Sequence, residues 1–253
     1  RVYNCSVWRT IGFVSYFWPL LVATTIVYLP AALFRLLGAR RLTRRLLETT
    51  VIVWCRHMLW MLGARITVSG LDNVPRHNRV CVVANHQSYG DTLMIQGYLG
   101  KVAGFVAKRE LASVPMMSFW MRFMHCVFVE RRNPRAARRA MTCGARNIVA
   151  GYPMVVFPEG TRSRGRPVGT FKAGAFRIAM ESDAEILPVT IDGTADLLER
   201  QGYLKSAPVF MTVHPAMRPE EYRAMTKPVL AEHVRRTVVS AMRADLQRQT
   251  PGV

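Results

Sequence analysis

The sequence predicts an α/β fold, in which a mixed, largely parallel sheet is covered by helices and preceded by an N-terminal membrane-associated two-helix hairpin. Two observations predict it. From about residue 63 onward, short apolar runs alternate with longer segments of helical pattern. Before that point, an uncharged apolar run is followed by a cluster of arginines. We therefore expect a membrane-embedded or interfacial helical hairpin over residues 1–62 and an α/β domain over residues 63–253.

Seven short runs have the pattern of strands and five longer segments have that of helices. The predicted strands are Arg65–Ser69, Arg79–Ala84, Val102–Ala107, Val127–Val129, Met154–Phe157, Ile186–Ile191 and Val209–Val213. The predicted helices are Thr92–Leu99, Pro115–Met124, Pro134–Val149, Ala173–Glu181 and Pro228–Gln249.

The first predicted hairpin segment contains no charged residue from Thr10 to Phe34, which is long enough to cross a bilayer. Pro19 and Pro30 lie inside it and are expected to kink or end a helix. Five arginines follow, at positions 35, 40, 41, 44 and 45. This order predicts that the following domain lies on the cytoplasmic side of a membrane, the inner membrane if the source is a bacterium.

The second hairpin segment, Leu46–Leu62, has the pattern of an interfacial amphipathic helix. The first segment either spans the membrane or re-enters it, and the sequence is compatible with both arrangements. The alternative is that both helices form a buried cap on a soluble domain. No small-residue cleavage site follows the apolar run, so we do not expect a cleaved signal peptide.

The net charge of +19 predicts a polyanionic partner: nucleic acid, anionic lipid or a phosphate-rich ligand. Charge alone leaves a merely solvated basic surface as an alternative. No nucleic-acid motif accompanies the arginines, so we expect no nucleic-acid partner. The five cysteines are scattered without CxxC spacing, so we expect neither a disulfide framework nor a metal site.

The stretch VCVVANHQSYGDTLMI holds the first candidate catalytic residues. His86 follows a predicted buried strand, and Asp91 stands five residues later, where a helix N-cap is expected. A carboxylate bonded to one imidazole nitrogen fixes the tautomer, and the other nitrogen can then remove a proton from a hydroxyl. On spacing alone, a structural histidine or half of a metal site is an equal alternative.

The stretch FPEGTRSRGRPVGTFKAG holds candidate phosphate ligands. Arg162, Arg164 and Arg166 occupy a predicted loop, and arginine suits a bidentate grip on phosphate. We expect Glu159 to form an ion pair with one of these cations and orient it. A solvated basic loop is the alternative.

Taken together, these stretches resemble the glycerolipid acyltransferase family, most closely its 1-acyl-sn-glycerol-3-phosphate (lysophosphatidic acid) acyltransferases. NHQSYGD is similar to the HxxxxD block, which implies that His86 is the base and Asp91 its partner. AKREL and VFVER are similar to a second block, and LPVTI to a fourth. FPEGTRS is similar to the third block. The implied substrate-binding residues are Lys108, Arg131, Glu159, Gly160, Thr161 and Arg162.

The resemblance implies an enzyme that moves a fatty acyl group from acyl-CoA or acyl carrier protein to the free hydroxyl of a lysophospholipid. The most similar members use lysophosphatidic acid and produce phosphatidic acid. The resemblance implies no cofactor and an anionic phospholipid membrane as partner. One departure is that His125 and Cys126 precede VFVER where the family usually has a glycine, which leaves the role of Arg131 open.

Three alternatives remain at this point. The chain could act on another lyso-lipid, or it could be a non-catalytic protein that binds anionic membranes. A lipid hydrolase using Ser88 or a cysteine is the third, although the chain lacks the GxSxG motif of many hydrolases.

Overall fold

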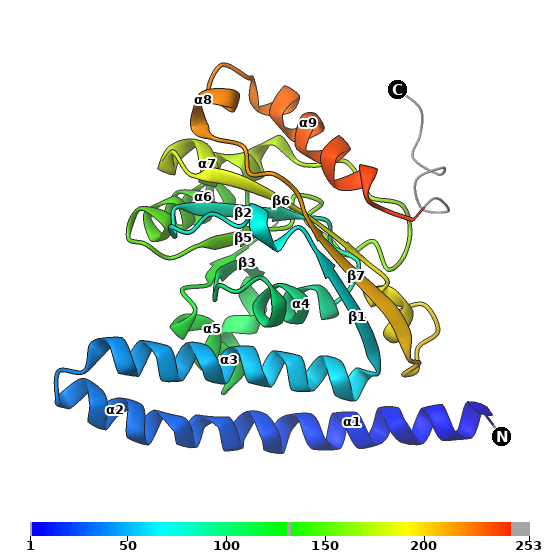
Figure 1. Ribbon diagram of the computed structural model, residues 1–253. Helices are drawn as coiled ribbons and strands as arrows, with labels where there is room; N and C mark the ends of the chain where they lie inside the picture. The colour runs from blue at the N-terminus through cyan, green and yellow to red at the C-terminus, as the bar shows by residue number, and fades with distance from the viewer. Residues whose placement is uncertain (1, 131–132, 244–253) are drawn as a thin grey trace.

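The computed structural model describes residues 2–130 and 133–243, and its N-terminal part is a helical hairpin (Figure 1). The first arm consists of α1 (Val2–Thr24), the 3-10 turn η1 (Thr25–Val27) and α2 (Tyr28–Leu36). The second arm is α3 (Arg40–Leu62), which runs alongside the first. The predicted pair of helices is therefore confirmed.

The two prolines of the first arm have different effects. Helix α1 continues through Pro19, so this proline does not end the helix. The 3-10 turn η1 ends three residues before Pro30, which lies inside α2. Since proline has no N–H to donate to the preceding turn, a break in the α-helical pattern here is expected.

One stripe of α3 is buried and fastens the hairpin to the rest of the molecule. Its residues recur three or four positions apart, which places them on one face of the helix. They are Leu47, Val51, Cys55, Met58, Leu59 and Leu62. Val53 and Trp60, in contrast, are exposed. The helix predicted for Leu46–Leu62 is thus confirmed, and one apolar stripe of it packs on protein. Its interfacial position stays a prediction.

The seven predicted strands are all present, each within two residues of its expected bounds. They are β1 (Ala64–Ser69), β2 (Val80–Ala84), β3 (Gly104–Lys108), β4 (Val127–Val129), β5 (Met154–Val156), β6 (Glu185–Asp192) and β7 (Ala207–Val213). They form one sheet in the order β1-β7-β6-β2-β5-β3-β4. Among these seven described strands, β6 and β7 pair antiparallel and the other neighbours pair parallel, so the mixed, largely parallel sheet is confirmed.

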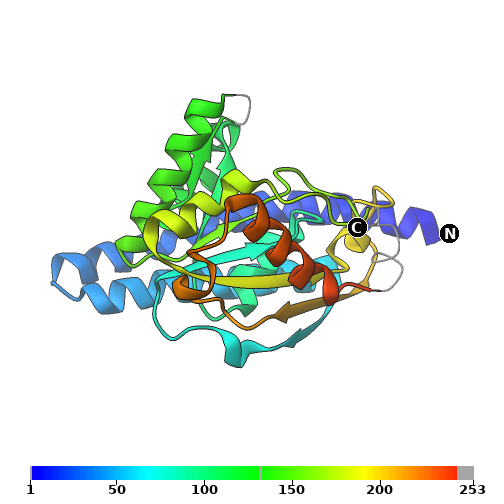
Figure 2. The ribbon, with the colours of Figure 1, turned by 90° about the horizontal axis from the view of Figure 1, so that it is seen from above.

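The remaining helices lie on both faces of this sheet (Figures 1 and 2). The α-helices are α4 (Gly90–Tyr98), α5 (Met117–Phe123), α6 (Pro134–Val149), α7 (Arg177–Ser182), α8 (Pro219–Tyr222) and α9 (Lys227–Ser240). Short 3-10 turns are η2 (Leu71–Asn73), η3 (Arg109–Ser113), η4 (Ala173–Phe176) and η5 (Thr194–Leu197). Helix α9 ends at Ser240, whereas the sequence predicted a helix to Gln249, which lies outside the described residues.

Two hydrophobic cores flank the sheet and fix the strands. Helices α6, α7 and α9 pack on one face around Ile178, Ile186 and Val234. Helices α3 and α4 pack on the other face around Leu59 and Met94. Because β2, β5 and β3 are parallel neighbours, their carboxyl ends lie at the same edge of the sheet. That edge carries the loops that hold the predicted site residues.

Candidate functional site

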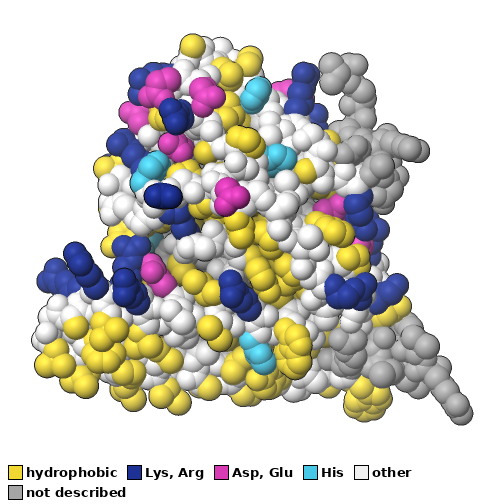
Figure 3. Space-filling model, viewed as in Figure 1, with side chains coloured by type: hydrophobic (Ala, Val, Ile, Leu, Met, Phe, Trp, Pro, Cys, Tyr) yellow, Lys and Arg dark blue, Asp and Glu magenta, His cyan; other side chains and the backbone are white. Residues whose placement is uncertain are grey.

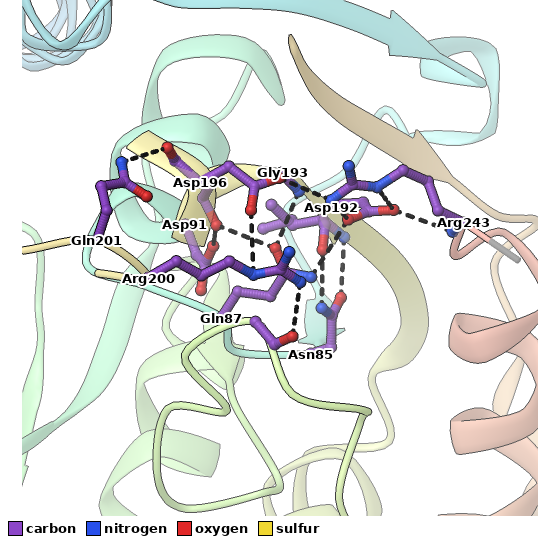
Figure 4. Close-up of polar contacts among 12 residues, drawn as sticks. Asn85, Gln87, Asp91, Asp192, Gly193, Asp196, Arg200, Gln201 and Arg243 are labelled. Atoms are coloured by element: carbon purple, nitrogen blue, oxygen red, sulfur yellow. Dashed lines mark hydrogen bonds and ion pairs between the residues drawn. The ribbon is translucent and has the colours of Figure 1, made fainter. Parts of the chain in front are cut away.

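The loop after β2 is held in place by the side chains on either side of His86 (Figure 4). The amide of Asn85 donates to the Ile191 carbonyl at 2.8 Å and accepts from the Ile191 N–H at 2.8 Å. Gln87 accepts from the Gly193 N–H at 2.9 Å. Both amides are buried. These contacts with the end of β6 and the residue after it fix the backbone on both sides of His86.

His86 and Asp91 are in direct contact, as the sequence predicted. The Nδ1 atom of His86 lies 2.7 Å from Oδ2 of Asp91. The same carboxylate oxygen accepts from the Ser88 N–H at 2.8 Å, and the other accepts from the Thr194 hydroxyl. Asp91 is fully buried and the His86 side chain is 12% exposed. The carboxylate therefore holds one ring nitrogen and leaves Nε2 available to a substrate.

The predicted position of Asp91 in its helix was wrong. Helix α4 begins at Gly90, with Tyr89 as its N-cap, so Asp91 lies in the first turn. Its carboxylate is occupied by His86, Ser88 and Thr194. A carboxylate in the first turn is favoured by the helix dipole, so this position also stabilises the negative charge.

Glu159 joins the two loops that carry the site. Its carboxylate accepts from the backbone N–H of His86 at 2.7 Å and from that of Gly169 at 3.0 Å. Burial raises the pKa of this carboxyl from its ordinary value of 4.5 to about 7. Among the described residues its hydrogen bonds come from these two amides, and it forms no ion pair with an arginine. The predicted ion pair between Glu159 and an arginine of the described loop is therefore wrong.

The loop after β5 also contacts the His86 loop directly. The His86 ring stacks on Phe157, with centroids 4.1 Å apart. The N–H of Ser163 donates to the His86 carbonyl at 2.7 Å, and that of Arg164 to the Gln87 carbonyl at 3.1 Å. The two loops that the sequence singled out are thus one hydrogen-bonded unit.

Arg162 is fixed beside this unit by two other side chains. Its guanidinium forms an ion pair with Glu199. It also lies over the ring of Tyr89, with Cζ 3.7 Å from the centroid. Because Tyr89 is in the His86 loop, the contact places the arginine next to that loop. Arginine held in this way can donate its remaining N–H groups to an anion.

The other predicted ligands differ in how closely the structure brings them to His86. Gly160 adopts a left-handed backbone conformation with φ +70°, next to Lys172, and Thr161 is exposed. Lys108 ends β3 at the same sheet edge, and its ammonium pairs with Glu110 at 2.8 Å. Arg131 lies outside the described residues.

Sequence reasoning missed several residues that build the site. Glu199 and Thr194 belong to the connection after β6, which matched no motif. Asn85 and Gln87 gave a weak signal, because buried amides on both sides of a histidine indicate a fixed loop. Within residues 2–130 and 133–243, no group of three or more His, Cys, Asp or Glu side chains could hold a metal ion.

Comparison with known proteins agrees with this geometry. The sequence profile of a family described as Acyltransferase matches residues 65–192, which is half of the chain and includes both loops. The chain belongs to this acyltransferase family. The 1-acyl-sn-glycerol-3-phosphate acyltransferase of Borreliella burgdorferi is 31% identical over 158 residues, which cover 62% of this chain and 63% of that protein.

Two further relatives extend the comparison. A probable 1-acyl-sn-glycerol-3-phosphate acyltransferase of Mycoplasma pneumoniae is 33% identical over 60% of this chain and 58% of its own length. The matches thus span about three fifths of these curated relatives. The crystal structure of PlsC, the 1-acyl-sn-glycerophosphate acyltransferase of Thermotoga maritima, superposes with a TM-score of 0.83 at 26% identity. That superposition covers 93% of this chain and 94% of PlsC.

Proposed function

We propose that this protein transfers a fatty acyl group from an acyl thioester to the free hydroxyl of 1-acyl-sn-glycerol-3-phosphate and so forms phosphatidic acid. The contact of 2.7 Å between His86 and the buried Asp91, next to Arg162, is the observation that carries the proposal. The similar acyltransferases from Borreliella burgdorferi and Thermotoga maritima are named for this acceptor, which supports the choice.

In the proposed mechanism, Asp91 holds Nδ1 of His86 and Nε2 removes the proton of the acceptor hydroxyl. The oxygen attacks the thioester carbonyl, a tetrahedral intermediate forms, and it collapses with release of the thiolate. Because the acceptor brings its own hydroxyl, no enzyme nucleophile is needed. Asp91 stabilises the imidazolium that forms transiently.

We assign the acceptor phosphate to Arg162, together with Gly160, Thr161, Lys108 and Arg131. In this proposal Glu159 contributes by fixing the His86 backbone and the loop that carries Arg162. The donor is acyl-CoA or acyl carrier protein, and the reaction uses no cofactor.

The N-terminal hairpin is proposed to hold the enzyme on the membrane, with residues 63–253 as the catalytic domain on the cytoplasmic side. Residues Thr10–Leu36 form a helical stretch long and apolar enough to cross a membrane. In its most apolar 18-residue segment, only 11% of the residues are buried. Apolar side chains line the lower surface of this stretch, and basic side chains lie just above it (Figure 3). Arg41, Arg44 and Arg45, with Lys101, border a shallow hollow suited to anionic lipid headgroups.

The test is product analysis with the purified protein in lipid vesicles. Labelled acyl-CoA or acyl carrier protein is combined with lysophosphatidic acid, another lysophospholipid or glycerol 3-phosphate. We expect phosphatidic acid from lysophosphatidic acid. His86→Ala should lower kcat by about 10²–10⁴-fold, the usual contribution of a general base, with folding and vesicle binding unchanged.

The control is His77→Ala, because His77 is exposed and pairs with Glu185 away from the site. Near-normal turnover by His86→Ala would overturn the assignment of the base. If the wild-type protein formed no phosphatidic acid with either donor, the proposed reaction would be wrong.

A further inference from the structure

The connection between β6 and β7, residues 193–206, touches both loops of the site. The hydroxyl of Thr194 donates to Asp91, which orients His86. The guanidinium of Arg200 donates to the Gly165 carbonyl at 2.7 Å, and Glu199 pairs with Arg162. Figure 4 shows Asp91 close to Gly193, Asp196 and Arg200 of this connection. The connection therefore positions the proposed base and the proposed phosphate ligand together.

Arg162 is held on two sides, which limits how it can bind an anion. Its Nη1 donates to Glu199, and the face of its guanidinium lies on the ring of Tyr89. The side chains of Arg162 and Glu199 are only 21% and 13% exposed. A guanidinium has five N–H groups in a fixed planar arrangement. With Nη1 engaged, the other N–H groups keep a constant direction.

Glu199 needs Arg162 as a partner. Its second oxygen, Oε2, is buried and has no hydrogen-bond partner among the described residues. If Arg162 moved away to meet a substrate, this carboxylate would be left buried without compensation, which is strongly unfavourable. Arg162 therefore stays paired with Glu199, and an anion that binds it meets its remaining N–H groups.

We propose that Glu199, supported by Tyr89, is a positioning residue that determines headgroup specificity. The inference rests on the proposed function, in which Arg162 binds the acceptor. Glu199 fixes the direction of the Arg162 N–H groups, so the arginine selects an anion by the direction of its oxygens as well as by its charge. A terminal phosphomonoester offers three oxygens and two negative charges to the oriented N–H groups, whereas a phosphodiester offers two oxygens and one charge. Arg162, held by Glu199 and Tyr89, therefore favours a lysophospholipid with a terminal phosphate. We call these three side chains the arginine clamp.

The experiment compares kcat/KM for lysophosphatidic acid and lysophosphatidylcholine with one acyl donor. Glu199→Gln keeps the shape of the side chain and removes its charge, so Arg162 is held less firmly. We expect the preference for lysophosphatidic acid to fall about tenfold, mainly through KM. The matched control is Glu181→Gln, which breaks the ion pair with Arg177 on α7 and should leave the preference unchanged.

A second pair of variants tests the contribution of Tyr89 to the arginine clamp without altering a buried charge. Tyr89 is 65% exposed, so its substitution leaves the core intact. Tyr89→Phe keeps the ring under Arg162 and should retain the preference, whereas Tyr89→Ala should reduce it.

The possible outcomes separate this inference from the proposed function. An unchanged preference in both Glu199→Gln and Tyr89→Ala overturns it. An equal loss on both acceptors also overturns it, since that is the result of a merely structural role. If the wild-type protein transfers no acyl group to lysophosphatidic acid, the proposed function fails first and this inference fails with it.

Discussion

The loop after β2 buries polar side chains, whereas the first arm of the hairpin exposes apolar ones. Asn85, Gln87 and Asp91 are at most 1% exposed, and each has hydrogen-bond partners within the protein. On the hairpin, Leu29 is 73% exposed and Leu36 is 85% exposed. In a soluble protein, such groups usually occupy the opposite environments.

The difference shows how each region depends on its surroundings. The buried polar groups find their partners inside the protein, so their geometry is independent of the solvent. Many apolar side chains of α1 and α2 in the described part of the chain stay exposed, and a large exposed apolar surface marks a site of contact with lipid or protein. One region is thus complete in the folded chain, and the other leaves an apolar surface that the proposed contact with a membrane would cover.

Removing the charge of Asp91 should have the largest effect on the buried region. Asp91→Asn keeps the size of the side chain but no longer stabilises an imidazolium at His86. We expect kcat to fall by about 10³-fold, measured at saturating concentrations of both substrates. Thr194→Val is the comparison, because it removes one hydrogen bond from the same carboxylate and leaves its charge. A larger loss in Thr194→Val than in Asp91→Asn would contradict the orienting role.

A smaller effect is expected when the exposed region is made polar. Leu29, Leu33 and Leu36 are each more than half exposed on α2. Full burial of one leucine contributes about 1.5–3 kcal/mol. Because these three are already partly covered, we expect about 1 kcal/mol from each, so the triple change to Ser should weaken vesicle binding by about 100-fold, measured by co-sedimentation.

The control for the hairpin variant is Val149→Ser, an equally exposed apolar residue on α6. It should leave vesicle binding unchanged, and both variants should unfold at the same urea concentration as the wild type. If the triple variant still sedimented with vesicles, the hairpin would not be the membrane contact.

The smallest effect concerns Glu159, whose carboxyl pKa is raised to about 7 by burial. Because the folded protein binds this proton more tightly than the unfolded chain, stability is greatest below the ordinary pKa of 4.5 and falls as the pH rises to about 7. Glu159→Gln removes this dependence. We expect the free energy of unfolding of the wild type, relative to the variant, to fall by up to about 3 kcal/mol between these values.

Urea unfolding of both proteins at several pH values checks this prediction. All other titrating groups are shared, so the difference isolates Glu159. Glu181→Gln serves as a control, because that carboxylate is partly exposed and paired with Arg177. A difference that did not vary with pH would show that Glu159 ionises normally.

Much of the fold could be predicted because apolar runs report burial directly. The run VCVVA is buried on both faces of the sheet and forms β2. Helix α6 begins at its predicted residue because Asn133 caps it and Pro134 suits the first helical position. The end of α9 was missed, since its helical pattern continues past Ser240 without a glycine or proline to stop it.

The site was predictable where its chemistry is local in the sequence. His86 and Asp91 are five residues apart, and their contact follows from one turn. Glu199 is 37 residues from Arg162, and only the return of the chain after β6 brings them together. No pattern of residue types around Glu199 predicts its contact with Arg162. The roles of Lys108 and Arg131 as ligands stay predictions.

A single hydrogen bond gives the hairpin a mechanical connection to the site. The N–H of Leu204 donates to the hydroxyl of Thr10 on α1 at 2.9 Å. Leu204 lies five residues after Glu199 in the same connection. A tilt or vertical shift of α1 in a bilayer would therefore pull on the main chain that anchors Arg162. Measured acceptor preference should then vary with bilayer thickness, even though Glu199 lies in the connection after β6 and not in the hairpin.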